Sequence, residues 1–274
     1  IAEDQRLTLR YRLSSDEIRD VSRTASPAIF EDEGTAITSG PGVTWTLDRR
    51  NDPVEPTRGF LMELRQDFAG VGGDTQYSQT VGSVKGWRGF LDGDVVASLE
   101  FEAGALFGLG EDLRVTDRFF LGGDSFRGFA RDGIGPRDTS VVRLPTVDET
   151  GAPVVPPSTE RVFRDDALGG EYYAIARADV SFPLGLPEEL GIFGGLFADV
   201  GTLWGLDKTV YVDDQAAGGG RVVVDDALRL RATVGASLFI DSPFGPLRFN
   251  FATPIQEEPG DRDEFFRFTI GTRF

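Results

Sequence analysis

Apolar and polar residues alternate along the chain in runs of about ten, each followed by a turn-rich stretch. In the C-terminal run, Phe266, Phe268 and Ile270 fall on one face, and Arg267 and Thr269 fall on the other. A period of two residues is that of a β-strand with one apolar side. Similar runs place candidate strands at residues 7–13, 42–48, 59–69, 75–87, 95–107, 171–182, 190–204, 228–240, 246–253 and 264–274. We predict an all-β protein, because no segment shows a convincing helical period.

The connections between these candidate strands alternate between short and long. The short links are 49–57, 88–94, 183–189 and 241–245, and the long polar ones are 14–41, 110–167, 205–227 and 256–263. Only the link around Gly70–Asp74 breaks the alternation by being short. Short turns on one side and long loops on the other are typical of outer-membrane barrels, whereas a soluble β-sandwich has no reason to follow this rule.

We therefore predict a transmembrane antiparallel β-barrel, and the alternative on the hydrophobic pattern alone is a soluble sandwich. The short turns are expected in the periplasm, and residues 110–167 and 205–227 outside the cell. The connection 110–167 is far longer than the ~15 residues beyond which structureless loops usually have a function. We predict that this loop is a functional element.

Composition narrows the classes of function. The chain has no Cys and no His, so it cannot build a Cys/His zinc site, a disulfide or a Ser–His dyad. We predict no enzyme activity and no cofactor. A net charge of −17 argues against nucleic acid as a partner, because phosphate binding needs clustered Lys and Arg. The acidic pairs Asp165-Asp166, Asp213-Asp214 and Asp225-Asp226 lack the spacing of a calcium loop, and we predict a solvated acidic surface there.

One stretch of the long loop resembles a known family. Residues 122–129 read Gly-Gly-Asp-Ser-Phe-Arg-Gly-Phe, and Ile-Gly-Pro-Arg follows at 134–137. This is similar to the loop of BamA-type outer-membrane protein assembly factors (the bacterial surface antigen family), which carries Arg-Gly-Phe followed by Ile-Gly-Pro. Further matches follow in the same order: Gly169-Gly170, residues 197–201 with Trp204, residues 241–249, and a terminal strand ending in Phe274. Together they cover nearly the whole chain.

The resemblance implies that this loop folds back into the barrel, where its arginine reaches acidic residues of the next two strands. The positions that match the family motif are Phe126, Arg127, Gly128 and Phe129, with Asp179 and Asp199 as the acidic partners. Parity agrees independently, because both Asp residues lie opposite the apolar face of their strands. A guanidinium offers a rigid fork that can bond two carboxylates. The alternative is that these are three solvated charges of the wall.

The C-terminal strand resembles the β-signal of outer-membrane proteins, which alternates apolar residues and ends on an aromatic. Its residues here are Phe266, Phe268, Ile270 and Phe274. Physically, an edge strand presents unpaired backbone groups that another chain can bind by β-augmentation. In the family, this strand also pairs with the first strand of the barrel in a weak seam.

The function implied by the resemblance is that of an insertase of the bacterial outer membrane, which folds and inserts other β-barrel proteins. Its expected partners are outer-membrane lipids, nascent β-barrel proteins and, mainly through POTRA domains, accessory lipoproteins. The alternatives are a related barrel for protein translocation or secretion, TamA-like or of the two-partner type, and a passive porin.

The chain also departs from the family pattern. The family barrel has sixteen strands preceded by POTRA domains, so residues 1–274 are expected to be its C-terminal part, with about ten strands and loop 110–167 inserted. The signal peptide, the POTRA domains and the first strands are expected to be absent from this chain. Phe126 stands where the family usually has Val, Ile or Met.

Overall fold

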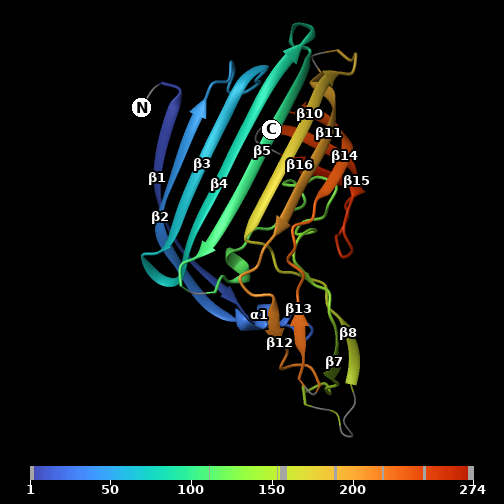
Figure 1. Ribbon diagram of the computed structural model, residues 1–274. Helices are drawn as coiled ribbons and strands as arrows, with labels where there is room; N and C mark the ends of the chain where they lie inside the picture. Colours follow the sequence, from blue (N-terminus) through green and yellow to red (C-terminus); the bar gives the residue numbers. More distant parts are fainter. Residues whose placement is uncertain are drawn as a thin grey trace.

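The computed structural model describes residues 3–110, 112–152, 154, 159–187, 190–217, 219–242 and 245–270. Most of them form one large antiparallel sheet (Figure 1). Its ten strands are β1 (Gln5–Ile18), β2 (Gly34–Asp48), β3 (Arg58–Gly70), β4 (Gly72–Phe90), β5 (Val95–Gly108), β10 (Tyr172–Pro183), β11 (Ile192–Trp204), β14 (Arg231–Ser242), β15 (Gly245–Gln256) and β16 (Phe266–Ile270). The prediction of an all-β chain is confirmed. Parts of the predicted turns 183–189 and 241–245, and Phe274, lie outside the described residues.

The strands of this sheet are ordered as they occur in the sequence, so each pairs with the next one along the chain. In such an up-and-down order, consecutive strands run in opposite directions, as they do in β-barrels that cross a membrane. The sheet curls, and β14, β15 and β16 turn away behind β10 and β11 in the view of Figure 1. Among the described residues β1 and β16 are the two edges and do not pair with each other. Closure into a barrel stays a prediction.

The two faces of the sheet have opposite character, with apolar side chains on the outside. Leu9 is 77% exposed, Leu196 57% and Phe101 52%, whereas Asp199 and Thr233 on the inner face are completely buried. A water-soluble protein rarely exposes so large a continuous apolar face. The sheet is therefore inverted relative to a soluble β-protein, with charges inside and hydrocarbon side chains outside. No helix among the described residues is long and apolar enough to cross a membrane.

Several predicted boundaries were wrong at the end of the sheet that carries the long connections. Residues 14–18 and 34–41 belong to β1 and β2, although the hydrophobic pattern places them in a loop. A short helix, α1 (Pro27–Glu31), lies between these strands, where we expected no helix. Conversely, β14 begins only at Arg231. In β1 and β2, backbone pairing continues here without an apolar outer face, so the alternation of apolar and polar residues is lost. The five residues of α1 are too few to show a helical period.

The long connections are not structureless. Residues 109–171 contain η2 (Val115–Asp117), β6 (Arg137–Asp138), β7 (Val141–Pro145), β8 (Thr159–Phe163) and β9 (Asp166–Ala167), and residues 205–230 contain β12 (Val210–Val212) and β13 (Arg221–Val223). These elements gather with α1 at one end of the sheet (Figure 1). A buried ion pair joins them, with Arg164 Nη1 2.7 Å from Asp213 Oδ2. The long connections therefore pack into one cap instead of extending separately.

Candidate functional site

Residues 119–138 leave the cap and lie against the inner face of the sheet. Isolated β-bridges fix this segment at three places: Phe119 with Gly170, Leu121 with Ile134, and Phe129 with Asp263. The segment turns at Gly122, where the Ser125 hydroxyl donates to the Gly122 carbonyl over 2.9 Å. We call residues 119–138 the lumen loop.

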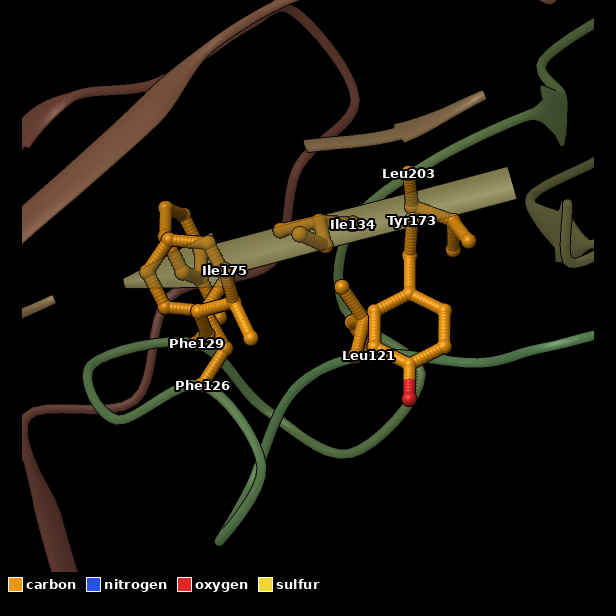
Figure 2. Close-up of a cluster of buried hydrophobic side chains, with 7 residues drawn as sticks. All are labelled: Leu121, Phe126, Phe129, Ile134, Tyr173, Ile175 and Leu203. Carbon is orange, nitrogen blue, oxygen red and sulfur yellow. The ribbon is translucent and has the colours of Figure 1, made fainter. Parts of the chain in front are cut away.

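An apolar cluster anchors the lumen loop to the sheet (Figure 2). Phe126 and Phe129 are fully buried, and their rings meet edge to face with centroids 5.1 Å apart. Tyr173 and Ile175 of β10 and Leu203 of β11 belong to the same cluster, together with Leu121 and Ile134 of the loop. Burial of these apolar side chains stabilises the docked loop but does not fix its orientation. The polar contacts nearby fix the position of the loop on the sheet. Phe126, which stands where the family usually has a smaller apolar residue, is accommodated with its side chain fully buried.

Arg127 lies between the two predicted acidic partners. Its Nε is 2.8 Å from Asp199 Oδ2, and its Nη2 also donates to Asp199 Oδ1. On the other side, its Nη1 is 2.5 Å from Asp179 Oδ1, and Nη2 is 3.2 Å from Asp179 Oδ2. One guanidinium thus bonds carboxylates of two adjacent strands, β10 and β11, with a paired contact on each. This is the fork geometry that Lys cannot reproduce.

The surroundings of Arg127 favour its charged form and fix its orientation. The side chain stacks on Phe197, with Cζ 3.8 Å from the ring centroid, and the Thr233 hydroxyl donates to the Arg127 carbonyl over 2.8 Å. Burial alone would lower the pKa of Arg127, but the hydrogen bonds and negative charges of Asp199 and Asp179 outweigh it and raise the pKa. The arginine is 4% exposed and remains a cation. Its position is held from three strands at once.

Gly128 lies at a point of close approach between the lumen loop and β14. Its φ is +91°, and a Cβ at this position would lie 2.8 Å from Thr233 Cγ2. Both the backbone conformation and the space therefore require glycine. The Gly128 carbonyl also accepts a hydrogen bond from the Glu264 backbone N–H over 3.0 Å, which leaves little freedom to move away.

We expect Gly128→Ala to weaken docking of the lumen loop by about 1–3 kcal/mol from backbone strain alone, with a further cost from the contact. Limited proteolysis of the loop measures the change. Gly151→Ala is the control, because Gly151 also has a positive φ, +84°, but no atom lies within 4 Å of its added Cβ. Equal sensitivity of the two variants would show that the close approach at Gly128 is unimportant.

Two further arginines take part that sequence reasoning did not single out. Arg177 of β10 donates to the Ser125 carbonyl through Nη2 over 2.7 Å, and its Nη1 is 3.0 Å from Glu100 Oε1. Arg248 of β15 places Nη2 3.2 Å from Asp179 Oδ1. Parity places both on the inner face. Arg177 lies directly opposite Glu100 of β5, so a search for opposite charges at paired inward positions would have found it, whereas Arg248 lies three strands from Asp179 in the sheet. The lumen loop is therefore held by a network of arginines in which Arg127 is central.

The C-terminal strand β16 lies at an edge of the sheet. Its outward side chains Phe266, Phe268 and Ile270 are 46%, 45% and 63% exposed. The segment just before it bonds to the lumen loop, with the Ala130 N–H donating to the Arg262 carbonyl over 2.8 Å. The Thr269 hydroxyl also donates to Asp124 Oδ1 over 2.8 Å. Thus the predicted signal strand and the predicted loop motif contact each other.

One member of each acidic pair considered as a calcium site forms an ion pair with an arginine. Asp165 pairs with Arg262, and Arg229 pairs with Asp225. Asp213 is 1% exposed against Arg164, so the prediction of a solvated acidic surface was wrong at this residue. The described part of the chain holds no group of three or more acidic side chains arranged to bind a metal ion.

An up-and-down antiparallel sheet with an apolar outer face and a loop bound to its charged inner face defines a class of membrane β-proteins. The chain belongs to the Omp85 superfamily, whose domain matches residues 1–274. It is 33% identical over its full length to the outer membrane protein assembly factor BamA of Neorickettsia risticii, of which it covers 32%. It is 27% identical to BamA of Neisseria meningitidis, over 85% of this chain and 28% of that protein.

One further relative and a solved structure are also similar to this chain. The human sorting and assembly machinery component 50 homolog is 28% identical over 94% of this chain and 50% of its own length. The crystal structure of Haemophilus ducreyi BamA lacking POTRA domains 1–3 matches the whole chain with a TM-score of 0.73 at 22% identity, over 52% of that structure. The chain spans about a third to a half of the length of these relatives.

Proposed function

We propose that this chain is the membrane-embedded part of an assembly factor of the bacterial outer membrane, which folds and inserts other β-barrel proteins. The observation that carries the proposal is the bridge from Arg127 to Asp179 and Asp199, because it fixes a loop inside the sheet instead of leaving an open passage. The inverted sheet and the assembly-factor names of the relatives support it. Outer-membrane lipids would cover the apolar face.

In this proposal the wall is closed by strands outside the chain. The free edge of β1 can pair with a preceding strand, and a family barrel of sixteen strands would result, with residues 1–274 as its C-terminal part. The short turns would face the periplasm, and the cap would face the exterior. Accessory lipoproteins would bind mainly through POTRA domains, which precede the barrel in the family.

The work we propose is mechanical and involves no bond chemistry, so this is not an enzyme. A nascent barrel protein would be recognised as an incoming strand at the edge formed by β16, through backbone hydrogen bonds. The lumen loop would hold that edge from inside, through Arg262, Glu264 and Thr269. Among the alternatives, a passive porin is disfavoured by the loop that occupies the inner face.

The test is reconstitution of the full-length protein in liposomes. A urea-unfolded outer-membrane β-barrel protein is diluted into them, and its folding is followed by the altered gel mobility of the unheated sample. We expect folding several-fold faster than in protein-free liposomes. Equal rates would contradict the insertase function. Delivery of a soluble passenger into the liposome would favour a translocation barrel, and rapid leakage of small sugars would favour a porin.

A further inference from the structure

Two arginines lie at outward positions of the sheet, at the end that carries the short turns. Arg58 is the first residue of β3, and Arg88 lies two residues before the end of β4. The two residues are directly paired across these strands, which lie side by side in Figure 1. On the same face, Phe60 follows Arg58, and Phe90, which is 51% exposed, follows Arg88. We call Arg58 and Arg88 the outer arginine pair.

Positive charges at these two positions are exceptional for this sheet. At the same end, the outward positions of the other eight strands carry no charged residue in the part of the chain that the structure describes. The whole chain has a net charge of −17, so two adjacent cations are not a general property of its surface. Like charges directly opposite each other destabilise a sheet. An anion between the two guanidinium groups would remove this cost.

The chain itself does not supply that anion. Neither guanidinium of the outer arginine pair forms an ion pair or a side-chain hydrogen bond with another residue that the structure describes. The arginines of the adjoining turn do: Arg49 Nε is 2.7 Å from Asp4 Oδ2, and Arg50 Nη2 is 2.6 Å from Asp48 Oδ2. Both members of the outer arginine pair are exposed, so an anion from outside the chain can reach them.

We propose that the outer arginine pair binds the phosphate of an anionic phospholipid in the periplasmic leaflet. The inference rests on the proposed membrane location of the sheet, with its short turns in the periplasm. The Cβ atoms of directly opposite residues are about 4.5–5.5 Å apart, so both side chains can reach one phosphate. Each guanidinium offers a fork of N–H donors that matches phosphate oxygens. Phe60 and Phe90 suit the membrane interface, where aromatic girdles of outer-membrane barrels lie.

The charge of the pair determines which lipid is preferred. Phosphatidylcholine carries an ammonium group next to its phosphate, and two arginines repel that cation, whereas the glycerol headgroup of phosphatidylglycerol has no positive charge. A soluble anion lacks the acyl chains that keep a lipid phosphate at the level of the membrane interface. The pair should therefore prefer phosphatidylglycerol to both phosphatidylcholine and inorganic phosphate.

The test uses native mass spectrometry of the full-length protein in detergent, titrated with dioleoyl phosphatidylglycerol or dioleoyl phosphatidylcholine. We expect Arg58→Gln and Arg88→Gln each to weaken binding of the first phosphatidylglycerol by about fivefold, and the double variant by at least about tenfold. The double variant should also lose the preference for phosphatidylglycerol. In a second measurement, added phosphatidylglycerol should raise the thermal midpoint of the unchanged protein and not that of the double variant.

The matched control is Arg6→Gln. Arg6 is an exposed arginine at the same end of the sheet, opposite Thr46 on the inner face, so this variant loses one positive charge where lipid has no access. Its lipid binding should equal that of the unchanged protein. An undiminished preference in the double variant, or an equal loss in Arg6→Gln, overturns the proposal. Displacement of the lipid by an equal concentration of inorganic phosphate would overturn the assignment to a lipid.

The lipid titration contains no substrate protein, so its outcome is separate from that of the liposome folding assay. Failure of the folding assay with an intact preference for phosphatidylglycerol would reject the assembly function alone. Normal folding of substrates without that preference would reject the lipid site alone.

Discussion

Arg127→Ala in the full-length protein is expected to destabilise the assembled sheet by about 3–5 kcal/mol, the usual cost of removing one partner from a buried ion pair. Asp199 is completely buried and receives its hydrogen bonds from Arg127, so the substitution would leave a carboxylate in a low-dielectric site without a cation. Unfolding by urea in lipid bilayers measures the free energy. Arg127→Lys restores the charge but not the two paired contacts, and should recover only part of the loss.

Two further variants decide whether this bridge is the cause. Adding Asp199→Asn to Arg127→Ala removes the stranded charge, so the double variant should be more stable than the single one. Arg229→Ala serves as the control, since Arg229 forms ion pairs with Asp225 and Glu258 at the surface and should change stability little. Similar urea midpoints for Arg127→Ala and Arg229→Ala would contradict the central role of the bridge.

Leu196→Arg should destabilise the sheet by about 2–4 kcal/mol if the middle of β11 lies near the bilayer midplane. Leu196 is 57% exposed and points outward, so the new charge would have to enter hydrocarbon. Gln79→Arg is the matched comparison, because Gln79 pairs with Asp67 on the inner face and a charge there meets polar neighbours. The fraction of folded protein in bilayers reports both. If the two variants fold equally well, the outer face is not lipid-exposed.

The strands could be predicted because lipid and lumen impose opposite polarity on alternate residues. That constraint ends where the sheet leaves the apolar layer, and the predicted strands end there too. β1 and β2 continue past the predicted boundaries with mostly polar side chains on their outer face. The ladders β7–β8 and β12–β13 of the cap are fixed by contacts between loops far apart in sequence. No local period encodes such contacts.

The candidate site was predictable to a similar degree. Parity indicated that Asp179 and Asp199 face inward, and the motif resemblance indicated Arg127. Parity shows which face a side chain lies on but not which residues it contacts. It therefore does not show that Arg248 of β15 contacts Asp179, or that the lumen loop covers Thr233. These contacts depend on the curl of the sheet, which is a property of the whole fold. The roles of these residues in assembly, and of the strand that carries Phe266, stay predictions.

The lumen loop has a consequence for the order in which this protein can fold. Arg127 contacts Asp179 at a separation of 52 positions, Asp199 at 72 and Thr233 at 106, so its partners lie on strands that are progressively farther along the chain. Such long separations slow folding, because each loop must close before its contact forms. The polar inner face itself provides no apolar cluster against which the strands from β11 to β16 could pack. Phe126 and Phe129 form such a cluster with β10 and β11, and we expect the wall from β11 to β16 to assemble around this part of its own loop.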